Sequence, residues 1–298
     1  MSSLKLNVKS ETGKLKKVVI GCPHNFHSVA PEIVNEKQRV SYGGKNKPTV
    51  ASLQPEFKAF KDAMEKHGVE VLELCPVEGV PDQLTPRDIA FVIGDTLVIS
   101  GMAKASRKNE FLGLGPVLET MDPAKILKVP GGIVLEGGDV VFDKGIIFVG
   151  ISQRTTMKGA QFLQEHFPDY QVVPVHLKSL GDGEDILHLD CAFLPFGNFG
   201  VFNLHTYYSA FYYPDGFEYV PPMMSAMYRL IEVTREEQQE LAINILSLSH
   251  NLVISRDSST RVNQLLTEDS VKVIPIQFNE APKTGGSFRC CSLPLVRE

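Results

Sequence analysis

The sequence predicts an α/β fold in which one supersecondary unit is repeated in a closed, quasi-symmetric arrangement. Three segments start with Asp at positions 88, 139 and 190, which places successive starts 51 residues apart. Each segment has Phe three residues after the Asp, then turn residues, then a second apolar run. Helical patterns lie between these segments. Because a repeated unit buries its apolar face mainly against its neighbours, we expect a compact, closed domain rather than an open solenoid.

Each repeated segment is expected to be a β-hairpin introduced by an acidic residue. The expected turns contain residue types that tight hairpins favour, and they fall at Gly94-Asp95, at Lys144-Gly145 and around Gly197-Asn198. The acidic residue that opens each hairpin then occupies an equivalent position in every unit.

Helices and closing strands complete the expected units. Apolar residues recur at three- and four-residue steps over 106–120 and 155–167, the spacing of an amphipathic helix. Two further helices are expected at 55–67 and 234–248, the second opened by Thr234 with Glu237 three positions later. Apolar runs rich in β-branched residues are expected to be strands, and they lie at 69–74, 170–175, 271–276 and 294–297.

Composition limits the classes of function. The chain has 298 residues, 43% of them hydrophobic, so it can bury a large core. Length alone suggests about two domains, but closed α/β folds of this size are often single units, and we expect one domain over 1–298. The net charge of -5 argues against nucleic acid or an anionic membrane as a partner. No run approaches the roughly 18 consecutive apolar residues of a membrane span, and no secretory signal is recognised.

The cysteines indicate a reducing environment. Five are present, an odd and widely scattered number, which argues against a disulfide framework. We therefore expect a cytoplasmic protein with free thiols. Cys22, Cys75 and Cys191 are expected to be buried packing residues, as most free cysteines are. A metal fragment in GCPHNFH, with His24 and His27 beside Cys22, is disfavoured because its spacing matches no common zinc pattern.

The residues that head the hairpins are candidates for a shared site. They are Arg87-Asp88, Glu136-Gly-Gly-Asp139 and His188-Leu-Asp190. Equivalent positions of axial repeats point toward one centre, so these acidic groups and the histidine suggest a polar core around something cationic. The alternative is that the repeated Asp caps a turn, which we favour for Asp139.

The partner of such a carboxylate cluster is either a metal ion or a cationic ligand. Carboxylates, a histidine and a cysteine make an odd mixture of hard and soft ligands for one ion. A planar guanidinium fits better, because carboxylates grip its N–H groups in pairs. A cysteine from the C-terminal GGSFRCCSLPLVRE could then attack the guanidinium carbon while the histidine moves protons. Packing, metal binding and disulfide formation are the alternatives for that cysteine.

Four motifs resemble the guanidino-group-modifying, or pentein, superfamily. They are LEGGDVV at 135–141, GISQRTT at 150–156, LHLDCAFLP at 187–195 and the C-terminal GGSFRCCSLPLVRE, and they stand in the family's order. The resemblance runs from about residue 15 to the end of the chain. It implies a five-bladed α/β propeller of ββαβ repeats with pseudo-fivefold symmetry. Members include arginine deiminases, arginine dihydrolases, dimethylarginine dimethylaminohydrolases and amidinotransferases.

The resemblance also implies roles for individual residues. Cys290 matches the nucleophile and His188 the general acid/base. The carboxylates that hold the guanidinium match Asp88, Glu136 and Asp190. The arginines that receive the substrate's α-carboxylate match Arg107 and Arg154, and Arg289 stands where arginine deiminases also carry an arginine. Cys291 is expected to be a packing residue.

We therefore expect a cofactor-free, metal-free hydrolase of the guanidino group of arginine or a close derivative, acting through a covalent amidino-thioether on Cys290. Asp190 and Arg289 favour a deiminase-like enzyme, whereas the short chain and the SQRT and Cys-Cys-Ser features resemble the dimethylarginine hydrolases. An amidinotransferase is a further alternative, and an arginine-binding regulatory protein is the non-enzymatic one. The expected partners are a small guanidino substrate with a carboxylate and, at most, a second copy of the chain as a homodimer.

Two further segments and the penultimate residue have predicted structures. The polar, glycine-rich stretch 35–49 is expected to be a mobile loop, with a role as a lid over the substrate as a weaker hypothesis. The aromatic stretch 205–222 is expected to be a surface loop or an oligomer contact rather than a wall of the pocket. Arg297 is expected to face solvent or a salt-bridge partner.

Overall fold

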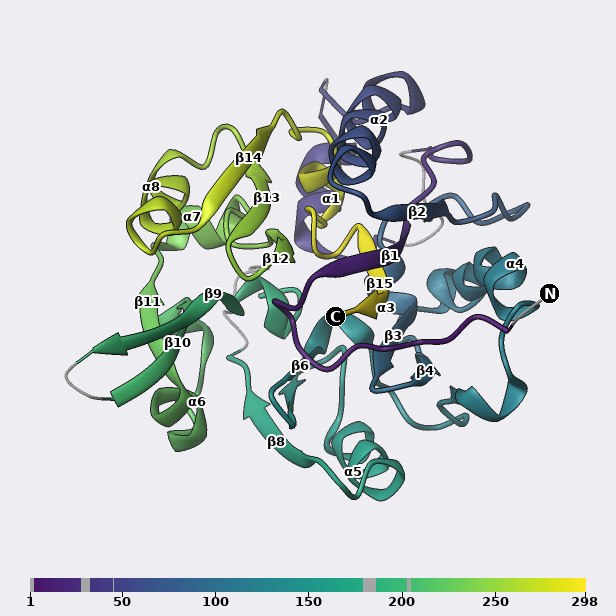
Figure 1. Ribbon diagram of the computed structural model, residues 1–298. Coiled ribbons are helices and arrows are strands. Elements are labelled where there is room, and N and C mark those ends of the chain that lie inside the picture. Colours follow the sequence, from purple (N-terminus) through teal and green to yellow (C-terminus); the bar gives the residue numbers. More distant parts are fainter. Residues whose placement is uncertain (1–2, 28–32, 45, 179–185, 203–204) are drawn as a thin grey trace.

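The computed structural model describes residues 3–27, 33–44, 46–178, 186–202 and 205–298. For residues 198–202 and 205–207 it describes the backbone alone. Within the described residues the chain forms five three-stranded sheets, arranged around a common centre (Figure 1). The α/β class expected from the sequence is confirmed.

Four of the sheets follow one pattern in chain order. A hairpin of two antiparallel strands comes first, and a third strand then joins parallel to the second. These sheets consist of β3 (Ala90–Ile93), β4 (Thr96–Ile99) and β5 (Ile126–Lys128); β6 (Val140–Asp143), β7 (Ile146–Ile151) and β8 (Gln171–His176); β9 (Phe193–Phe202), β10 (His205–Tyr212) and β11 (Tyr228–Glu232); and β12 (Leu246–Ser249), β13 (Leu252–Arg256) and β14 (Lys272–Ile276).

The fifth sheet joins the two ends of the chain. Its strands are β15 (Ser292–Arg297), β1 (Leu15–Ile20) and β2 (Glu70–Glu73), with β15 antiparallel and β2 parallel to β1. The sheet thus has the pattern of the other four, with the C-terminal strand in the place of the first hairpin strand. Arg297 is buried in it and donates to the carbonyls of Gly13 at 2.7 Å and Ser247 at 2.8 Å. The expectation that Arg297 faces solvent or a salt-bridge partner is wrong.

Helices connect the second and third strands of each sheet. The longer ones lie at the periphery in Figure 1, and they are α2 (Val50–Lys66), α5 (Met157–His166) and α8 (Thr260–Glu268). Shorter helices are α1 (Glu36–Tyr42), α3 (Pro86–Ile89), α4 (Gly115–Leu118), α6 (Pro222–Met227) and α7 (Arg235–Gln239). Single 3₁₀ turns are η1 (Ala105–Arg107), η2 (Glu110–Leu114), η3 (Pro123–Lys125), η4 (Gly137–Asp139), η5 (Leu189–Cys191), η6 (Pro214–Gly216) and η7 (Ala281–Thr284).

Two expected helices are broken. Over 106–120 the chain forms η1, η2 and α4 instead of one helix, because Gly113, Gly115 and Pro116 interrupt the regular hydrogen bonding. Over 234–248, Thr234 and Glu237 form the expected capping box, but α7 ends at Gln239. Leu241 then takes a left-handed φ of 57°, which terminates the helix, and residues from Leu246 onward form β12. The helices expected at 55–67 and 155–167 are present as α2 and α5.

The predicted position of the third hairpin turn is also wrong. The first two turns fall at Gly94-Asp95 and Lys144-Gly145 as expected. In the third unit, β9 continues through Gly197 to Phe202. Gly197 has a φ of 76°, and the pairing of β9 with β10 shifts register across it. The glycine therefore marks a β-bulge within the strand rather than its end.

Two stretches expected to be loops are regular structure. Residues 36–42 form α1, capped by Asn35, whose side chain accepts a hydrogen bond from the backbone of Gln38. Residues 205–222 contain β10 and η6 and enter α6, and Phe211 is fully buried in the core. The surface-loop and mobile-loop expectations are therefore wrong for most of these residues. No helix in the part of the chain that is described is long and apolar enough to cross a membrane.

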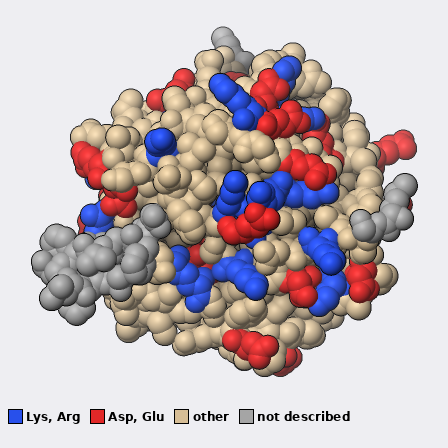
Figure 2. Space-filling model, viewed as in Figure 1, with Lys and Arg blue, Asp and Glu red and all other residues tan. Residues whose placement is uncertain are grey.

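On the face shown in Figure 2, Lys and Arg side chains lie interspersed with Asp and Glu. The apolar side chains gather instead between the sheets and beneath the helices. Under α2, for example, the rings of Phe60, Phe278 and Phe288 pack with centroids 4.4 to 5.8 Å apart.

A buried carboxylate ties α2 to the segment that precedes the C-terminal strand. Glu56 accepts hydrogen bonds from the backbone N–H groups of Glu280 at 2.9 Å and Ala281 at 3.1 Å, at the start of η7. A single side chain thus satisfies the free N–H groups of this helical turn.

Replacement of Glu56 with Ala leaves these N–H groups without a partner inside the protein. We expect the free energy of unfolding to fall by about 1–3 kcal/mol, the cost of unsatisfied buried donors. Urea denaturation of Glu56→Ala measures it, with Glu65→Ala, an exposed carboxylate on the same helix, as the matched control. Equal stability of the two variants would contradict this role.

Candidate active site

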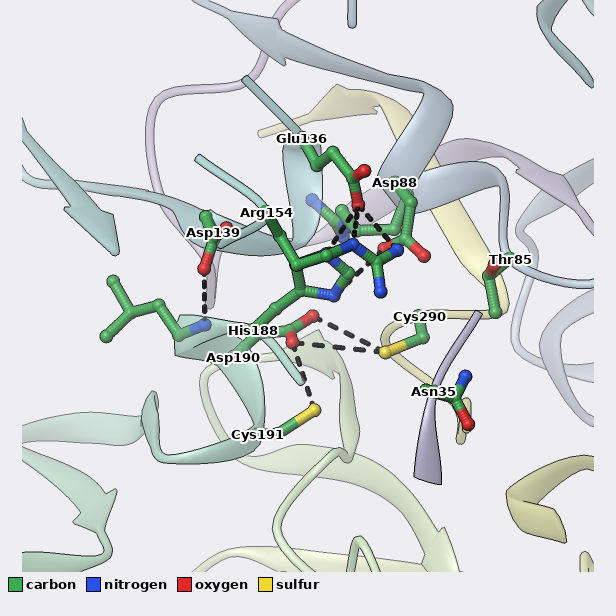
Figure 3. A network of polar contacts seen from close by, with 12 residues as sticks. Asn35, Thr85, Asp88, Glu136, Asp139, Arg154, His188, Asp190, Cys191 and Cys290 are labelled. Carbon is green, nitrogen blue, oxygen red and sulfur yellow. Dashed lines mark hydrogen bonds and ion pairs between the residues drawn. The ribbon is translucent and has the colours of Figure 1, made fainter. Parts of the chain in front are cut away.

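The residues that head the sheets lie together in a buried centre (Figure 3). Asp88 lies in α3, Glu136 immediately precedes η4, His188 immediately precedes η5, and Asp190 lies within η5. Cys290 precedes β15. All five side chains are buried. The convergence expected from the 51-residue repeat is therefore present in the structure.

His188 lies between two carboxylates. Its Nε2 is 2.8 Å from Oε2 of Glu136, and its Nδ1 is 3.6 Å from Oδ1 of Asp88. Burial lowers the pKa of His188, but the charges of Asp88 and Asp139 and the hydrogen bond to Glu136 outweigh burial and raise the pKa to about 10. His188 is therefore a protonated imidazolium near neutral pH, with a proton available for transfer at the centre of the site.

Two arginines are hydrogen-bonded to the same pair of carboxylates. Arg154 contacts Oε2 of Glu136 through Nε at 2.9 Å and Nη2 at 2.7 Å. Arg107 donates from Nη1 to Oδ2 of Asp88 at 2.7 Å. Burial opposes ionisation of Glu136, but Arg154 and His188 outweigh it and hold the pKa of Glu136 below its ordinary value. The two carboxylates expected to grip a guanidinium therefore each hold one from the protein itself.

Glu110 is a buried member of this network that the sequence analysis missed. It receives Nε and Nη2 of Arg107, each at 2.8 Å, in a bidentate pair. Thr85 accepts a further bond from Arg107 Nη2 at 2.7 Å. Glu110 follows Arg107 by three residues, so the spacing of an i,i+3 ion pair was a usable signal.

Arg289 joins the cysteine segment to the first residues of the chain. It donates from Nη1 to Oδ2 of Asp190 at 2.7 Å and from Nη2 to Oε1 of Glu11 at 2.8 Å. Burial opposes ionisation of Glu11, but Arg289 and Arg87 outweigh it and lower the pKa of Glu11 to about 2. Glu11 also escaped the sequence analysis, because nothing local marks a partner 278 residues away.

Cys290 is fixed by contacts to its thiol and to its backbone. The Sγ atom lies 3.6 Å from Oδ2 of Asp190. The side-chain oxygen of Asn244 accepts the N–H of Cys290 at 3.0 Å, and the amide nitrogen of Asn244 lies 3.4 Å from the carbonyl of Asp190. Asn244 therefore connects the segments that carry Cys290 and Asp190. No motif of the sequence pointed to it.

Asp139 has a structural role that differs in detail from the one expected. Its Oδ1 accepts the backbone N–H of Leu189 at 2.9 Å. It thus caps η5 of the next unit instead of a turn in its own hairpin, and it holds the turn that carries His188 and Asp190. Burial raises the pKa of Asp139 to about 7 against the lowering influence of nearby His188.

The remaining cysteines differ from one another. Cys291 is fully buried in the core beneath α2, as expected, and Cys22 is buried with its sulfur 3.2 Å from Nδ1 of His24. Cys75 is exposed, so its expected burial is wrong. Cys191 is buried, but it lies beside Cys290, and its sulfur is 3.3 Å from Oδ1 of Asp190. The sequence analysis had set it apart from the site.

One group of three side chains in the described part of the chain brings its ligand atoms close enough for a metal ion. These residues are Asp190, Cys191 and Cys290, whose ligand atoms all lie within 4.8 Å of one another. Cys22 and His24 belong to no such group within the same residues.

A narrow, polar pocket opens onto the site. Its lining includes Val34 and Asn35, which precede α1, and Gln38 of α1, together with Asp88, Arg107, Arg154 and His188. Asn35 donates to the carbonyl of Thr284 at 3.0 Å, so α1 rests directly on η7 beside the pocket.

Known proteins share both the sequence pattern and the fold. A family model described as N,N dimethylarginine dimethylhydrolase, eukaryotic, matches residues 23–297. The uncharacterized protein YkgA of Bacillus subtilis is 34% identical over 290 residues, which cover 97% of this chain and 94% of that protein.

Two solved structures share the fold at 19% sequence identity. An amidinotransferase of the saxitoxin biosynthetic pathway from Microseira wollei superimposes with a TM-score of 0.81, covering 98% of this chain and 97% of that one. DDAH from Pseudomonas aeruginosa, in complex with citrulline, superimposes with a TM-score of 0.76, covering 94% of this chain and 99% of that one.

The raised pKa of His188 gives the first prediction for this site. We expect NMR of the histidine ring to show a protonation midpoint at about pH 10. Glu136→Gln removes a negative partner and should lower the midpoint, and His188→Gln identifies the signal. Because folding favours the imidazolium, its contribution to stability is complete below pH 6.5 and is lost as the pH rises through about 10. A wild-type midpoint near 6.5 would contradict the described contacts.

The close packing around Gly138 gives the second prediction for this site. A Cβ atom there would lie 2.6 Å from Nδ1 of His188 and 2.7 Å from Oδ1 of Asp88, so the two side chains must shift. We expect Gly138→Ala to reduce the free energy of unfolding by about 1–3 kcal/mol, as overpacking does, and to lower the His188 midpoint. Gly131→Ala, where the added atom meets nothing within 4 Å, is the control and should leave both quantities unchanged.

Proposed function

The chain belongs to the N,N dimethylarginine dimethylhydrolase family of guanidino-group-modifying enzymes, and we propose that it hydrolyses a C–N bond in the guanidino group of arginine or a close derivative. The observation that carries this proposal is the convergence of a thiol, an imidazole and three carboxylates in one buried site. Carboxylates held this way suit a planar cation, and a thiol beside them suits attack on its electrophilic carbon.

In the proposed first step Cys290 is the nucleophile. Its thiolate attacks the guanidinium carbon, and an S–C bond forms to give a tetrahedral centre. Asp88, Glu136 and Asp190 hold the guanidinium N–H groups and keep the carbon oriented toward the sulfur. Collapse of this centre breaks one C–N bond, and the proton stored on His188 goes to the departing nitrogen. An amidino-thioether on Cys290 remains.

In the second step His188 works in the opposite direction. It is now neutral and takes a proton from a water molecule, whose oxygen attacks the thioether carbon. The C–S bond breaks, the thiolate of Cys290 is restored, and the product carries a C=O group where the leaving nitrogen was. The second proton of the water is lost as the C=O group forms and is taken up by the ammonia or amine released in the first step. The fixed charges of Asp88 and Glu136 favour the return of the imidazolium, which prepares the site for another turnover.

The substrate is proposed to carry a carboxylate as well as a guanidinium. Arg107 and Arg154 line the pocket and are proposed to receive that carboxylate. For this to happen, each arginine must release Asp88 or Glu136 to the substrate guanidinium and turn its N–H groups outward. Binding is then an exchange of one guanidinium for another on the same carboxylates.

Asp190 and the family match support different substrates. The position of Asp190 beside Cys290 provides an acceptor for an unmethylated guanidinium nitrogen, which favours arginine. Dimethylarginine is the second candidate, because the matching family model describes a dimethylarginine hydrolase. Transfer of the amidino group to an amine instead of water is the alternative reaction.

We also propose that residues 1–298 form one catalytic domain with the geometry of a five-bladed propeller. Five sheets with the same strand pattern around one centre support pseudo-fivefold symmetry. In this arrangement each blade points the residues at the start of its first strand toward the axis, where the site lies.

The test incubates the purified protein separately with L-arginine and with asymmetric N,N-dimethylarginine. Mass spectrometry follows citrulline, ornithine, ammonia and dimethylamine, together with an amidino adduct on the peptide that contains Cys290. We expect turnover of at least one substrate by wild type. Cys290→Ser should lose it by several orders of magnitude, as removal of a nucleophile does.

Cys291→Ser is the matched control, because it changes the adjacent thiol in the core and should retain turnover. Dimethylamine would assign the dimethylarginine reaction, and ammonia from arginine the deiminase-like one. An adduct that persists until an amine is added would assign a transferase. Turnover that survives in Cys290→Ser would overturn the proposed mechanism.

A further inference from the structure

Two thiols lie side by side in the buried centre. Cys191 and Cys290 come from different units, yet their sulfur atoms lie within 4.8 Å of each other and both contact the carboxylate of Asp190. Figure 3 shows both sulfurs facing this carboxylate. The two cysteines form a small apolar cluster with Leu187 and Leu241. The proposed reaction uses Cys290 alone and gives Cys191 no part.

We propose that Cys191 and Cys290 are a site of covalent modification by peroxide, at which the two thiols close into a reversible disulfide. To form the bond the sulfurs must approach from within 4.8 Å to about 2 Å. The partner thiol is held nearby before any oxidation takes place.

The fold selects Cys191 rather than Cys291 as the partner. Cys291 is adjacent in sequence, but its side chain packs into the aromatic core beneath α2, which is a different cluster from that of Cys290. Cys191 lies in η5, which the carboxylate of Asp139 caps through the N–H of Leu189. The cysteine beside the nucleophile in space is therefore the one 99 residues away in the chain.

Asn244 keeps the two thiols together. Its oxygen accepts the N–H of Cys290 at 3.0 Å, and its amide nitrogen lies 3.4 Å from the carbonyl of Asp190 and 3.9 Å from the sulfur of Cys191. One buried side chain thus contacts both cysteine-bearing segments. Such a link restricts their relative movement and raises the effective concentration of one thiol near the other.

The chemistry balances with hydrogen peroxide as the oxidant. The Cys290 thiolate attacks one peroxide oxygen, the O–O bond breaks, and a sulfenic acid and hydroxide form. Cys191 then attacks the sulfenic sulfur, an S–S bond forms, and the sulfenic oxygen leaves as hydroxide. The proton of Cys191 can pass to Asp190, which its thiol already faces at 3.3 Å. In total two thiols and one peroxide give one disulfide and two waters.

The order of these steps follows from the surroundings of Cys191. Its hydrogen bond with Cys290, its burial and the charge of Asp190 raise the pKa of the Cys191 thiol well above the ordinary value. Cys191 therefore stays protonated and does not react first with peroxide, since the thiolate is the reactive form. It reacts once Cys290 has become electrophilic.

The disulfide would block the nucleophile, a consequence that rests on the proposed function, and would protect it from further oxidation. A sulfenic acid without a neighbouring thiol proceeds to sulfinic and sulfonic acids, which thiol reductants do not reverse. With Cys191 beside it, Cys290 is returned to the thiol by reduction. The pair thus converts an irreversible loss of the nucleophile into a reversible one.

The test treats the full-length protein with hydrogen peroxide, quenches it and digests it with trypsin without reduction. Cleavage after Lys178, Arg229, Arg289 and Arg297 places Cys191 and Cys290 in separate peptides, 179–229 and 290–297. We expect wild type to yield these two peptides joined, lighter by two hydrogen atoms than their sum. Dithiothreitol should separate them, and the turnover lost on oxidation should return.

Cys191→Ser and Cys291→Ser are compared in the same way, each against its own reduced sample. We expect Cys291→Ser to form the linked peptides as wild type does. Cys191→Ser should instead accumulate two or three oxygen atoms on Cys290 and fail to recover with dithiothreitol. Circular dichroism verifies that each variant is folded.

Three results would overturn the proposal. They are oxygen addition to Cys290 of wild type without linkage, loss of the linkage in Cys291→Ser, which would make Cys291 the partner of Cys191, and no modification of either thiol. The peptide readout needs no substrate, so it decides the thiol chemistry even if the proposed hydrolase activity is absent. Loss of turnover without linkage would leave the hydrolase proposal standing and remove this one.

Discussion

Buried carboxylates at the centre of the molecule need cationic partners, and this requirement shapes the structure around them. Removing one partner from a buried ion pair typically costs about 3–5 kcal/mol, because the remaining charge is left without compensation. Arg154 and His188 compensate Glu136, and Arg107 compensates Asp88. Arg107 and Arg154 belong to the same units as their carboxylates, whereas His188 heads a different unit and contacts Glu136 and Asp88 of the two units before it. The histidine therefore reaches its carboxylate partners only when the units meet at their heads. Packing of the sheets around the centre and formation of the site therefore depend on each other.

The same requirement connects the two ends of the chain. Arg289 binds Asp190, in the turn η5 that leads into β9, and Glu11, which precedes β1. Pairing of β15 with β1 brings these partners together, and Cys290 stands between Arg289 and that strand. The cysteine thus reaches its place beside Asp190 only when the ring of sheets is closed. A site whose cysteine depends on closure is assembled only in the complete fold.

Much of this centre could be predicted from the sequence because it follows the repeat. Asp88, Glu136, His188 and Asp190 head equivalent hairpins, and equivalent positions around an axis must converge. The cysteine could be placed there only through the resemblance of its motif to a known family, because β15 completes a unit that begins at the other end of the chain.

The parts that escaped prediction lie outside the repeat. Asn244 enters the site because Leu241 takes a left-handed conformation that ends α7 early, and apolar periodicity over 234–248 does not report such a turn. Glu11 lies in an irregular segment whose partner is fixed by chain closure alone. Arg297 looks like an exposed terminal charge, yet two backbone carbonyls that no motif identifies receive it inside the fifth sheet. A sequence pattern therefore predicts which residues are buried together when it recurs in several units, as it does at the heads of the hairpins. It does not predict the partners of residues outside the repeat.

The internal ion pairs also bear on which ligands the proposed site can select. A bare pair of buried carboxylates would attract any cation, whereas Asp88 and Glu136 each already hold a guanidinium of the protein. A ligand must therefore replace Arg107 and Arg154 with bonds of equal quality, and a planar guanidinium offers the same fork of N–H donors. A simple ammonium has a compact charge and no fork, so it would leave part of each carboxylate unsatisfied. Arg107 keeps its bidentate pair with Glu110 after it leaves Asp88. Arg154, however, loses the carboxylate of Glu136 and is left uncompensated unless the ligand supplies an anion. A guanidinium and a carboxylate on one molecule therefore restore the charge balance in the pocket.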